Sequence, residues 1–212
     1  MRDACGRARK ARPHVILGGT QKAMDARNHA NGQRATGPAS LNNVNLEGFM
    51  ATVTRARQDE SLRRMTVHLD GHWLLDRGQP QFVGSLPTPA AGPQEFFADF
   101  PPGMGGWGLA PSAVQYCLYG AQACFVSTFA LVASLEGMEF RGLRVNTQAR
   151  INFTRFLGLG DEPVLEEIAW EVEVDGDAPP ERWERVLKEA EERCPASWIM
   201  QNQVPVRAVL KH

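Results

Sequence analysis

The chain carries no Asp, Glu, Lys or Arg between Phe100 and Leu135. The part from Leu109 onward is long enough to span a bilayer as a helix. Gln115, Gln122 and several hydroxyl side chains interrupt its apolar surface, however, and neither end has the cationic flank typical of membrane segments. We therefore predict no membrane span and interpret the segment as a long buried helix, packed against the core and a second subunit.

Helical patterns occur at three places in the chain. We predict a short amphipathic helix at Asn42–Arg57, the charge-free helix from Pro111-Ser112 to Gly137, and a second amphipathic helix after Asp177. Proline disfavours helical geometry in the residue before it, so Pro195 should break the last helix at Cys194.

Strand patterns fill most of the remaining sequence. They predict strands at Leu62–Leu69, His72–Leu75, Gln81–Leu86, Phe140–Phe153, Ile168–Val174 and Val204–Leu210. Asp70-Gly71 is typical of a hairpin turn and should join the first two strands. The Pro/Gly-rich segment Pro87–Gly108 is interpreted as a loop. This order of elements predicts an α+β domain with a mostly antiparallel sheet.

Residues 1–40 differ from the rest in composition. They are rich in Lys and Arg but contain only two acidic residues, Asp3 and Asp25. We expect a basic, poorly ordered extension there and one domain at 41–212. The extension lacks interleaved aromatic residues, and the net charge of the chain is -1. We therefore interpret it as a solvated arm rather than a nucleic-acid-binding element.

The four cysteines lie far apart and include no C-x-x-C pair. The first apolar run, Val15-Ile16-Leu17, is too short for the core of a secretory signal. These features favour a cytoplasmic location, where the reducing environment keeps cysteines free. Lone cysteines in that compartment are buried, redox-active or catalytic.

Two of the cysteines are candidates for chemistry. Cys124 lies on the charge-free helix among small residues, where it could be either a reactive thiol or a small packing residue. Cys194 precedes Pro195 at a helix break, so the dipole of the next helical turn could lower its pKa. Glu191 and Glu192 would oppose that shift, and the sequence does not decide its sign.

The sequence gives little support for a metal site, a phosphate-binding site or a hydrolase site. His68, Asp70 and His72 could suggest a metal, but side chains on a strand-turn-strand segment need not converge. The chain has no phosphate-binding, serine-hydrolase or zinc-protease motif. We predict no metal and no cofactor.

Three stretches together resemble the OsmC/Ohr family, and in particular its longer OsmC-like members. They are Pro111-Ser-Ala-Val-Gln-Tyr-Cys-Leu-Tyr-Gly-Ala-Gln-Ala-Cys124, the passage from Leu157 through Glu181, and Arg193-Cys-Pro-Ala-Ser197 followed by Asn202-Gln-Val-Pro-Val206. They occur in the order of the elements predicted above, and the likeness covers about residues 42–210.

This resemblance implies an intertwined homodimer with the charge-free helices at its centre and active sites between the subunits. It implies that Cys124 is the peroxidatic thiolate and Cys194 the resolving thiol. The expected reaction reduces an organic hydroperoxide, alkyl or lipid, through a sulfenic acid and an intramolecular disulfide that an external dithiol reduces. The alternative is a catalytically silent dimer that binds an apolar ligand.

The chain departs from the family pattern at two positions. Where the peroxidases have a glutamate that holds an arginine against the reactive sulfur, this chain has Gln115. Gln115 and Cys124 would point in opposite directions on an ideal helix, so either the helix bends near Gly120, the correspondence is off, or Gln115 has another role. For the arginine, Arg77 is one candidate, and Arg63 and Arg64 are others.

Overall fold

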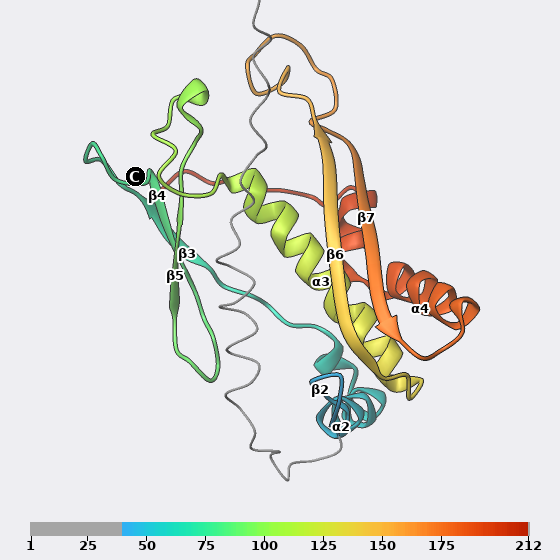
Figure 1. Ribbon diagram of the computed structural model, residues 1–212. Helices are drawn as coiled ribbons and strands as arrows, with labels where there is room; N and C mark the ends of the chain where they lie inside the picture. Colours follow the sequence, from blue (N-terminus) through green and yellow to red (C-terminus); the bar gives the residue numbers. More distant parts are fainter. Residues whose placement is uncertain (1–39, 212) are drawn as a thin grey trace, which may run out of the picture. The chain divides into compact units, whose positions relative to one another are not determined.

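A computed structural model describes residues 40–211 (Figure 1). The predicted extension at 1–40 lies outside them except for Ser40. The described chain has an α+β fold in which every strand pairing is antiparallel, as predicted, but the strands form separate small sheets. These are β1 (Ser40–Leu41) with β2 (Val44–Asn45); β3 (Asp70–Trp73), β4 (Phe82–Leu86) and β5 (Gln94–Ala98); and β6 (Phe140–Ile151) with β7 (Leu165–Gly176).

The charge-free segment forms the long helix α3 (Ala113–Leu135), as predicted. Its N-cap is Ser112, whose hydroxyl accepts the N–H of Gln115, while the Gln115 side chain accepts the N–H of Ser112. This reciprocal pair is a capping box. By length and composition α3 could cross a membrane. In the described domain it contributes buried residues to the core, among them Phe125, Phe129 and Val132.

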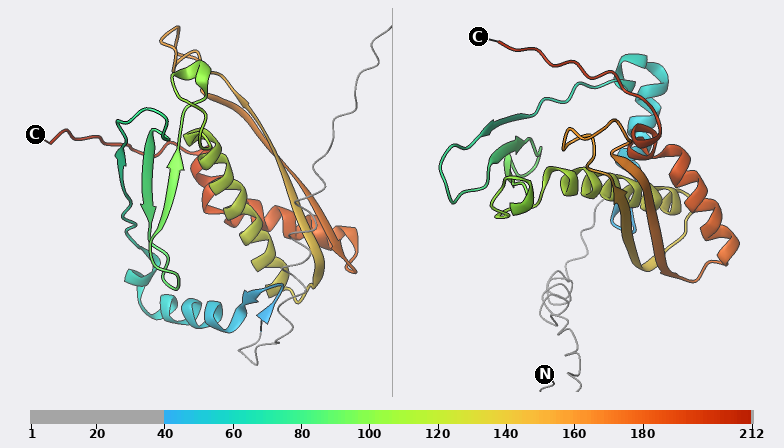
Figure 2. Two further views of the ribbon diagram at one scale, coloured as in Figure 1. Left: turned by 60° about the vertical axis from the view of Figure 1, so that its left-hand side comes forward. Right: turned by 90° about the horizontal axis from the view of Figure 1, so that it is seen from above.

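The core lies where α3 meets α4 (Pro180–Arg193) and the β6–β7 hairpin (Figure 2). Phe125 is 1% exposed and its ring stacks on Trp170 of β7 at a centroid distance of 4.5 Å. Val186 and Ala190 of α4 are fully buried in the same cluster. The predicted strands at Phe140–Phe153 and Ile168–Val174 are thus confirmed, the second in a longer form.

Helix α2 (Leu46–Gln58) confirms the first predicted helix but begins later than expected. Asn42 and Asn43 have φ of 53° and 61°, in the left-handed region. They form the turn between β1 and β2, and Asn45 then caps α2 by accepting the N–H of Gly48. Asparagine tolerates this backbone region, so the Asn-rich entrance is a turn rather than a first helical turn.

The predicted hairpin around Asp70-Gly71 is wrong. Both residues lie inside β3, where Asp70 pairs with Ser85 and Gly71 with Gly84. A Cβ at Gly71 would lie 2.3 Å from Cζ of Phe82, so this glycine permits the close approach of a neighbouring ring. The predicted strand Leu62–Leu69 is also wrong: its start belongs to the 3-10 helix Glu60–Arg63, and the rest has no regular structure.

Two further predictions need correction. The loop predicted at Pro87–Gly108 contains strand β5 and the short 3-10 helix Pro102–Met104. The strand predicted at Val204–Leu210 is absent from the described chain, where these residues are exposed and pair with no strand. None of the edge strands of the described sheets pairs with this strand-like segment.

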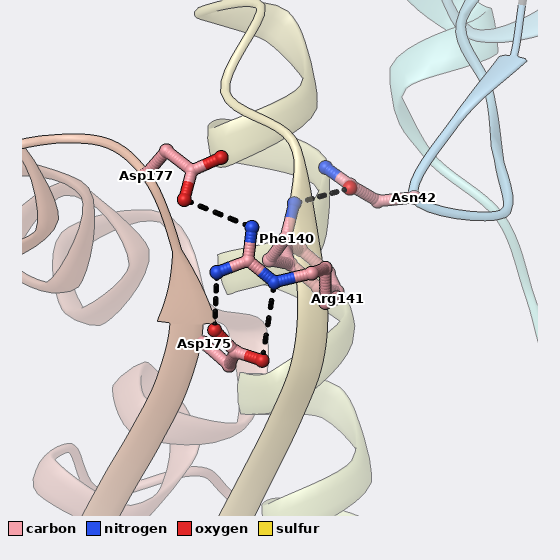
Figure 3. A network of polar contacts seen from close by, with 5 residues as sticks. All are labelled: Asn42, Phe140, Arg141, Asp175 and Asp177. Carbon is pink, nitrogen blue, oxygen red and sulfur yellow. Dashed lines mark hydrogen bonds and ion pairs between the residues drawn. The ribbon is translucent and has the colours of Figure 1, made fainter.

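The second amphipathic helix, α4, begins at Pro180 with Pro179 at its N-cap. Asp177 does not cap it; its carboxylate binds Arg141, which also pairs with Asp175 across the β6–β7 hairpin (Figure 3). The predicted break at Cys194 is confirmed. Cys194 ends α4 and also begins the short helix α5 (Pro195–Gln201).

Candidate functional site

The sulfur atoms of Cys124 and Cys194 lie 3.7 Å apart, although the residues are far apart in the sequence. Cys124 lies in the middle of α3 and is half-buried. Cys194 lies between α4 and α5 and is 1% exposed. Packing of α3 against the α4–α5 junction therefore brings together the two cysteines that the sequence singled out.

Local sequence explains the position of Cys194. Its N–H still closes the last turn of α4 by donating to the carbonyl of Ala190 at 2.9 Å. Pro195 then turns the chain, and the Cys194 sulfur accepts the N–H of Ser197 at 3.4 Å. A thiol thus occupies the N-cap position of α5, where serine or aspartate is more common.

The two thiols have opposite pKa shifts. Burial alone would raise the pKa of Cys194, but the nearby Ser197 hydroxyl and N–H, the Cys124 thiol and the Ala196 N–H lower it below its ordinary value. Burial raises the pKa of Cys124, and its contact with Cys194 raises it further, against an opposing hydrogen bond from the Ala196 N–H. In one isolated chain, Cys194 is therefore the first of the two thiols to lose its proton as pH rises.

Gln115 is not brought to the cysteine pair. Its side-chain oxygen accepts the N–H of Ser112 at 2.8 Å and the Ser112 hydroxyl at 3.1 Å. The helix runs from Ala113 to Leu135, so Gln115 lies about 13 Å along the axis from Cys124. Within this chain, Gln115 caps α3.

The arginines considered from the sequence lie elsewhere. Arg63 donates to the carbonyl of Ala56 and pairs with Glu60, whereas Arg64 and Arg77 are exposed. No arginine hydrogen-bonds to either sulfur within residues 40–211. A cation that activates Cys124 would have to come from outside this set of contacts.

Cys117 and the histidines considered for a metal site make no hydrogen bond to the cysteine pair. Cys117 is exposed on α3. His68 and His72 are exposed, with His72 in β3. The residues that the structure describes contain no group of three or more His, Cys, Asp or Glu able to hold a metal.

Two hollows adjoin the site elements. A cleft of about 660 Å³ lies beside α5 and is lined by Ser197, Trp170 and four glutamates: Glu166, Glu167, Glu191 and Glu192. A second, apolar cavity of about 330 Å³ lies at the start of α3, among Phe100, Val114, Phe153 and Phe156. Sequence reasoning missed Ser197, although the Cys-Pro-x-Ser spacing of a helix start could have revealed it.

Residues 105–209 match the family model described as OsmC-like protein. Over these residues the chain belongs to the OsmC-like family. The match contains Gln115, Cys124 and Cys194 and leaves out β1 to β5. It confirms the family that the sequence resembles.

Solved structures similar to this OsmC-like chain share little sequence with it. An organic hydroperoxide resistance protein OsmC from Legionella pneumophila is 19% identical, with a TM-score of 0.49; the alignment covers 65% of this chain and 90% of that one. An OsmC-like protein from Mycoplasma pneumoniae is 17% identical, with a TM-score of 0.47 and coverage of 65% and 88%. The comparison with curated proteins found no match.

Proposed function

We propose that this chain reduces organic hydroperoxides with Cys124 and Cys194. The observation that carries the proposal is the 3.7 Å separation of their sulfur atoms. A disulfide needs a separation of about 2.05 Å, so a small movement would join the two sulfurs. Membership in the OsmC-like family agrees with thiol chemistry at these positions.

The first chemical step takes place at Cys124, the more exposed of the two sulfurs. Its proton passes to solvent. The Cys124 thiolate then attacks the terminal oxygen of the hydroperoxide, so a sulfur–oxygen bond forms and the oxygen–oxygen bond breaks. The alkoxide takes a proton and leaves as an alcohol, and Cys124 becomes a sulfenic acid.

The second step closes the disulfide. The Cys194 thiolate attacks the Cys124 sulfenic acid and displaces hydroxide, which takes a proton from solvent and leaves as water. An external dithiol then reduces the disulfide and is itself oxidised. A reducing cytoplasm would keep such a dithiol available.

We further propose that the working form is an intertwined homodimer with active sites between the subunits. Large apolar side chains are exposed in one chain: Tyr119 on α3 is 64% exposed, Trp73 in β3 is 53% and Val206 near the end is 93%. The unpaired strand-like segment at Val204–Leu210 could pair with a strand of a second copy. Arg77 of one copy is the candidate cation for the cysteine pair of the other.

Thiol counting tests the proposed reaction. Reduced protein mixed with cumene hydroperoxide should lose about two thiols per chain, while Cys194→Ser should keep a sulfenic acid and Cys124→Ser should not react. Cys117→Ser is the matched control, since this exposed cysteine takes no part in the pair. Unchanged thiols in the parent would overturn the proposal.

The apolar cavity at the start of α3 favours one second candidate, the binding of an apolar ligand without catalysis. Its volume of about 330 Å³ lies within the range of small-molecule sites. A fluorescent naphthylamine probe should bind the parent and lose binding in Val114→Trp, which fills the cavity. Binding of this kind, with thiols that do not react with cumene hydroperoxide, would favour the second candidate.

A further inference from the structure

Ser197 is a buried serine whose hydroxyl is not used. The residue is 3% exposed, and its Oγ has no hydrogen-bond partner among the residues described. A buried polar group without a partner is destabilising, so native proteins retain few of them. Its backbone N–H, by contrast, already donates to the sulfur of Cys194.

We propose that Ser197 is a positioning residue for Cys194: its hydroxyl donates a hydrogen bond to the Cys194 thiolate and thereby sets how readily that thiolate closes the disulfide. This inference rests on the proposed function, because it assigns a role within the second step. The first turn of α5 already brings the N–H of this residue to the Cys194 sulfur, at 3.4 Å.

The chemistry of sulfur explains why the hydroxyl is unpartnered in the neutral pair. A thiol is a weak acceptor, whereas a thiolate accepts strong, charge-assisted hydrogen bonds. A serine hydroxyl can rotate, so it gains its partner when Cys194 loses its proton. The Ser197 hydroxyl is among the groups that lower the pKa of Cys194 against the effect of burial.

The burial of Cys194 makes such a donor necessary, because a buried thiolate is poorly solvated. Ser197 lines the acidic cleft together with Glu166 and Glu167 of β7 and Glu191 and Glu192 of α4. Arg150 of β6 binds Glu166 and Glu167, but no ion pair to Glu191 or Glu192 occurs in the described part of the chain. From α3, Cys124 faces the same sulfur. Burial opposes a thiolate at Cys194, so nearby hydrogen-bond donors must offset it.

The step that Ser197 assists is the closing of the disulfide. A sulfur–sulfur bond forms between Cys194 and Cys124, the sulfur–oxygen bond of the sulfenic acid breaks, and hydroxide leaves as water after taking a proton. No further oxidant is needed, because the hydroperoxide has already oxidised Cys124.

The test measures the charge of Cys194 directly. In a chain with Cys5→Ser, Cys117→Ser and Cys124→Ser, the ultraviolet absorbance of the remaining thiolate is followed against pH. Ser197→Ala should raise the midpoint by about one pH unit, a tenfold fall in the thiolate-to-thiol ratio at a given pH, and Ser197→Thr should restore it. Ser134→Ala is the matched control, because Ser134 is equally buried but lies at the far end of α3.

Two comparisons keep the test decisive. If Ser197→Ala does not fold, Ser197→Thr is compared with Ser197→Val. These two side chains have the same shape, and only threonine carries the hydroxyl. A midpoint that is the same with and without the hydroxyl would overturn the proposal. In the chain with all cysteines, Ser197→Ala should slow disulfide closure severalfold and leave the hydroperoxide step unchanged; equal slowing of both steps would contradict it.

Failure of the proposed function would look different. If cumene hydroperoxide leaves all thiols intact, the peroxidase proposal fails, but the thiolate midpoint still reports whether Ser197 controls the charge of Cys194.

Discussion

The side chain of Asn42 holds the start of β6 by accepting the N–H of Phe140 at 3.0 Å (Figure 3). Its amide nitrogen donates to the Ser134 hydroxyl at 2.9 Å and to the carbonyl of Met138 at 2.8 Å. One asparagine in the β1–β2 turn therefore satisfies groups at the end of α3, in the connection and in β6. These are the elements that carry Cys124 and the strand beside it.

Replacement of Asn42 by Ala should lower the free energy of unfolding by about 2–3 kcal/mol, because three hydrogen bonds are lost and buried groups remain unpaired. Urea unfolding measures the change. Asn43→Ala is the control, since Asn43 also has a positive φ but has no side-chain hydrogen bond to the described residues. Equal losses in both variants would show that backbone conformation, not the hydrogen bonds, is responsible.

The two cysteines should ionise in a defined order. The pKa of Cys194 is lowered by the hydrogen bonds of Ser197, and the pKa of Cys124 is raised by burial. As pH rises, thiolate absorbance should therefore appear in Cys124→Ser, which keeps Cys194, at a lower pH than in Cys194→Ser. Both variants are measured with Cys5 and Cys117 replaced by Ser. The reverse order would indicate that a cation absent from the described contacts controls Cys124.

The lowered pKa of Cys194 also determines how the stability of the folded chain changes with pH. A lowered pKa in the folded chain means that Cys194 favours folding once it is ionised. Its contribution is fully present above the pKa of an unfolded cysteine and is lost as pH falls through the folded value. Cys124, with a raised pKa, has the opposite effect at high pH.

Gln115 should act as a cap rather than as a catalytic group. Gln115→Ala should lower the free energy of unfolding by about 1 kcal/mol, because the capping box of α3 is lost. Gln115→Glu should preserve stability, since glutamate suits the same position of the box. Thiol loss with cumene hydroperoxide should be similar in both variants. A large gain in rate for Gln115→Glu alone would instead assign this position to the reactive site, reached through a second subunit.

Gly71 should resist replacement despite its ordinary backbone. Gly71→Ala places a Cβ 2.3 Å from Cζ of Phe82 and 2.9 Å from the carbonyl of Val83. We expect a loss of about 1–3 kcal/mol in urea unfolding, as is typical of overpacked sites. Gly103→Ala is the control, because nothing lies within 4 Å of its Cβ position. Equal stability of the two variants would contradict the β3–β4 pairing.

The sequence alone determined the elements whose cause is local. The absence of charge, the Ser112 cap and Gly137 set the limits of α3, which has both ends where they were predicted. Pro195 set the break at Cys194, because proline acts on the residue directly before it. The alternation of apolar and polar residues predicted β6 and β7 because one face of this hairpin packs on the core.

Tertiary structure decided what depends on distant partners. Asp70-Gly71 became part of a strand because Gly84 pairs with Gly71 and the Phe82 ring lies against it, which no local pattern records. Gln115 is a residue type that could serve an active site, but its side chain caps the start of its own helix. The cysteines could be nominated from the sequence, but their 3.7 Å contact and the opposite shifts of their pKa values arise only when α3 packs against the α4–α5 junction, since burial and hydrogen bonds come from residues far away along the chain.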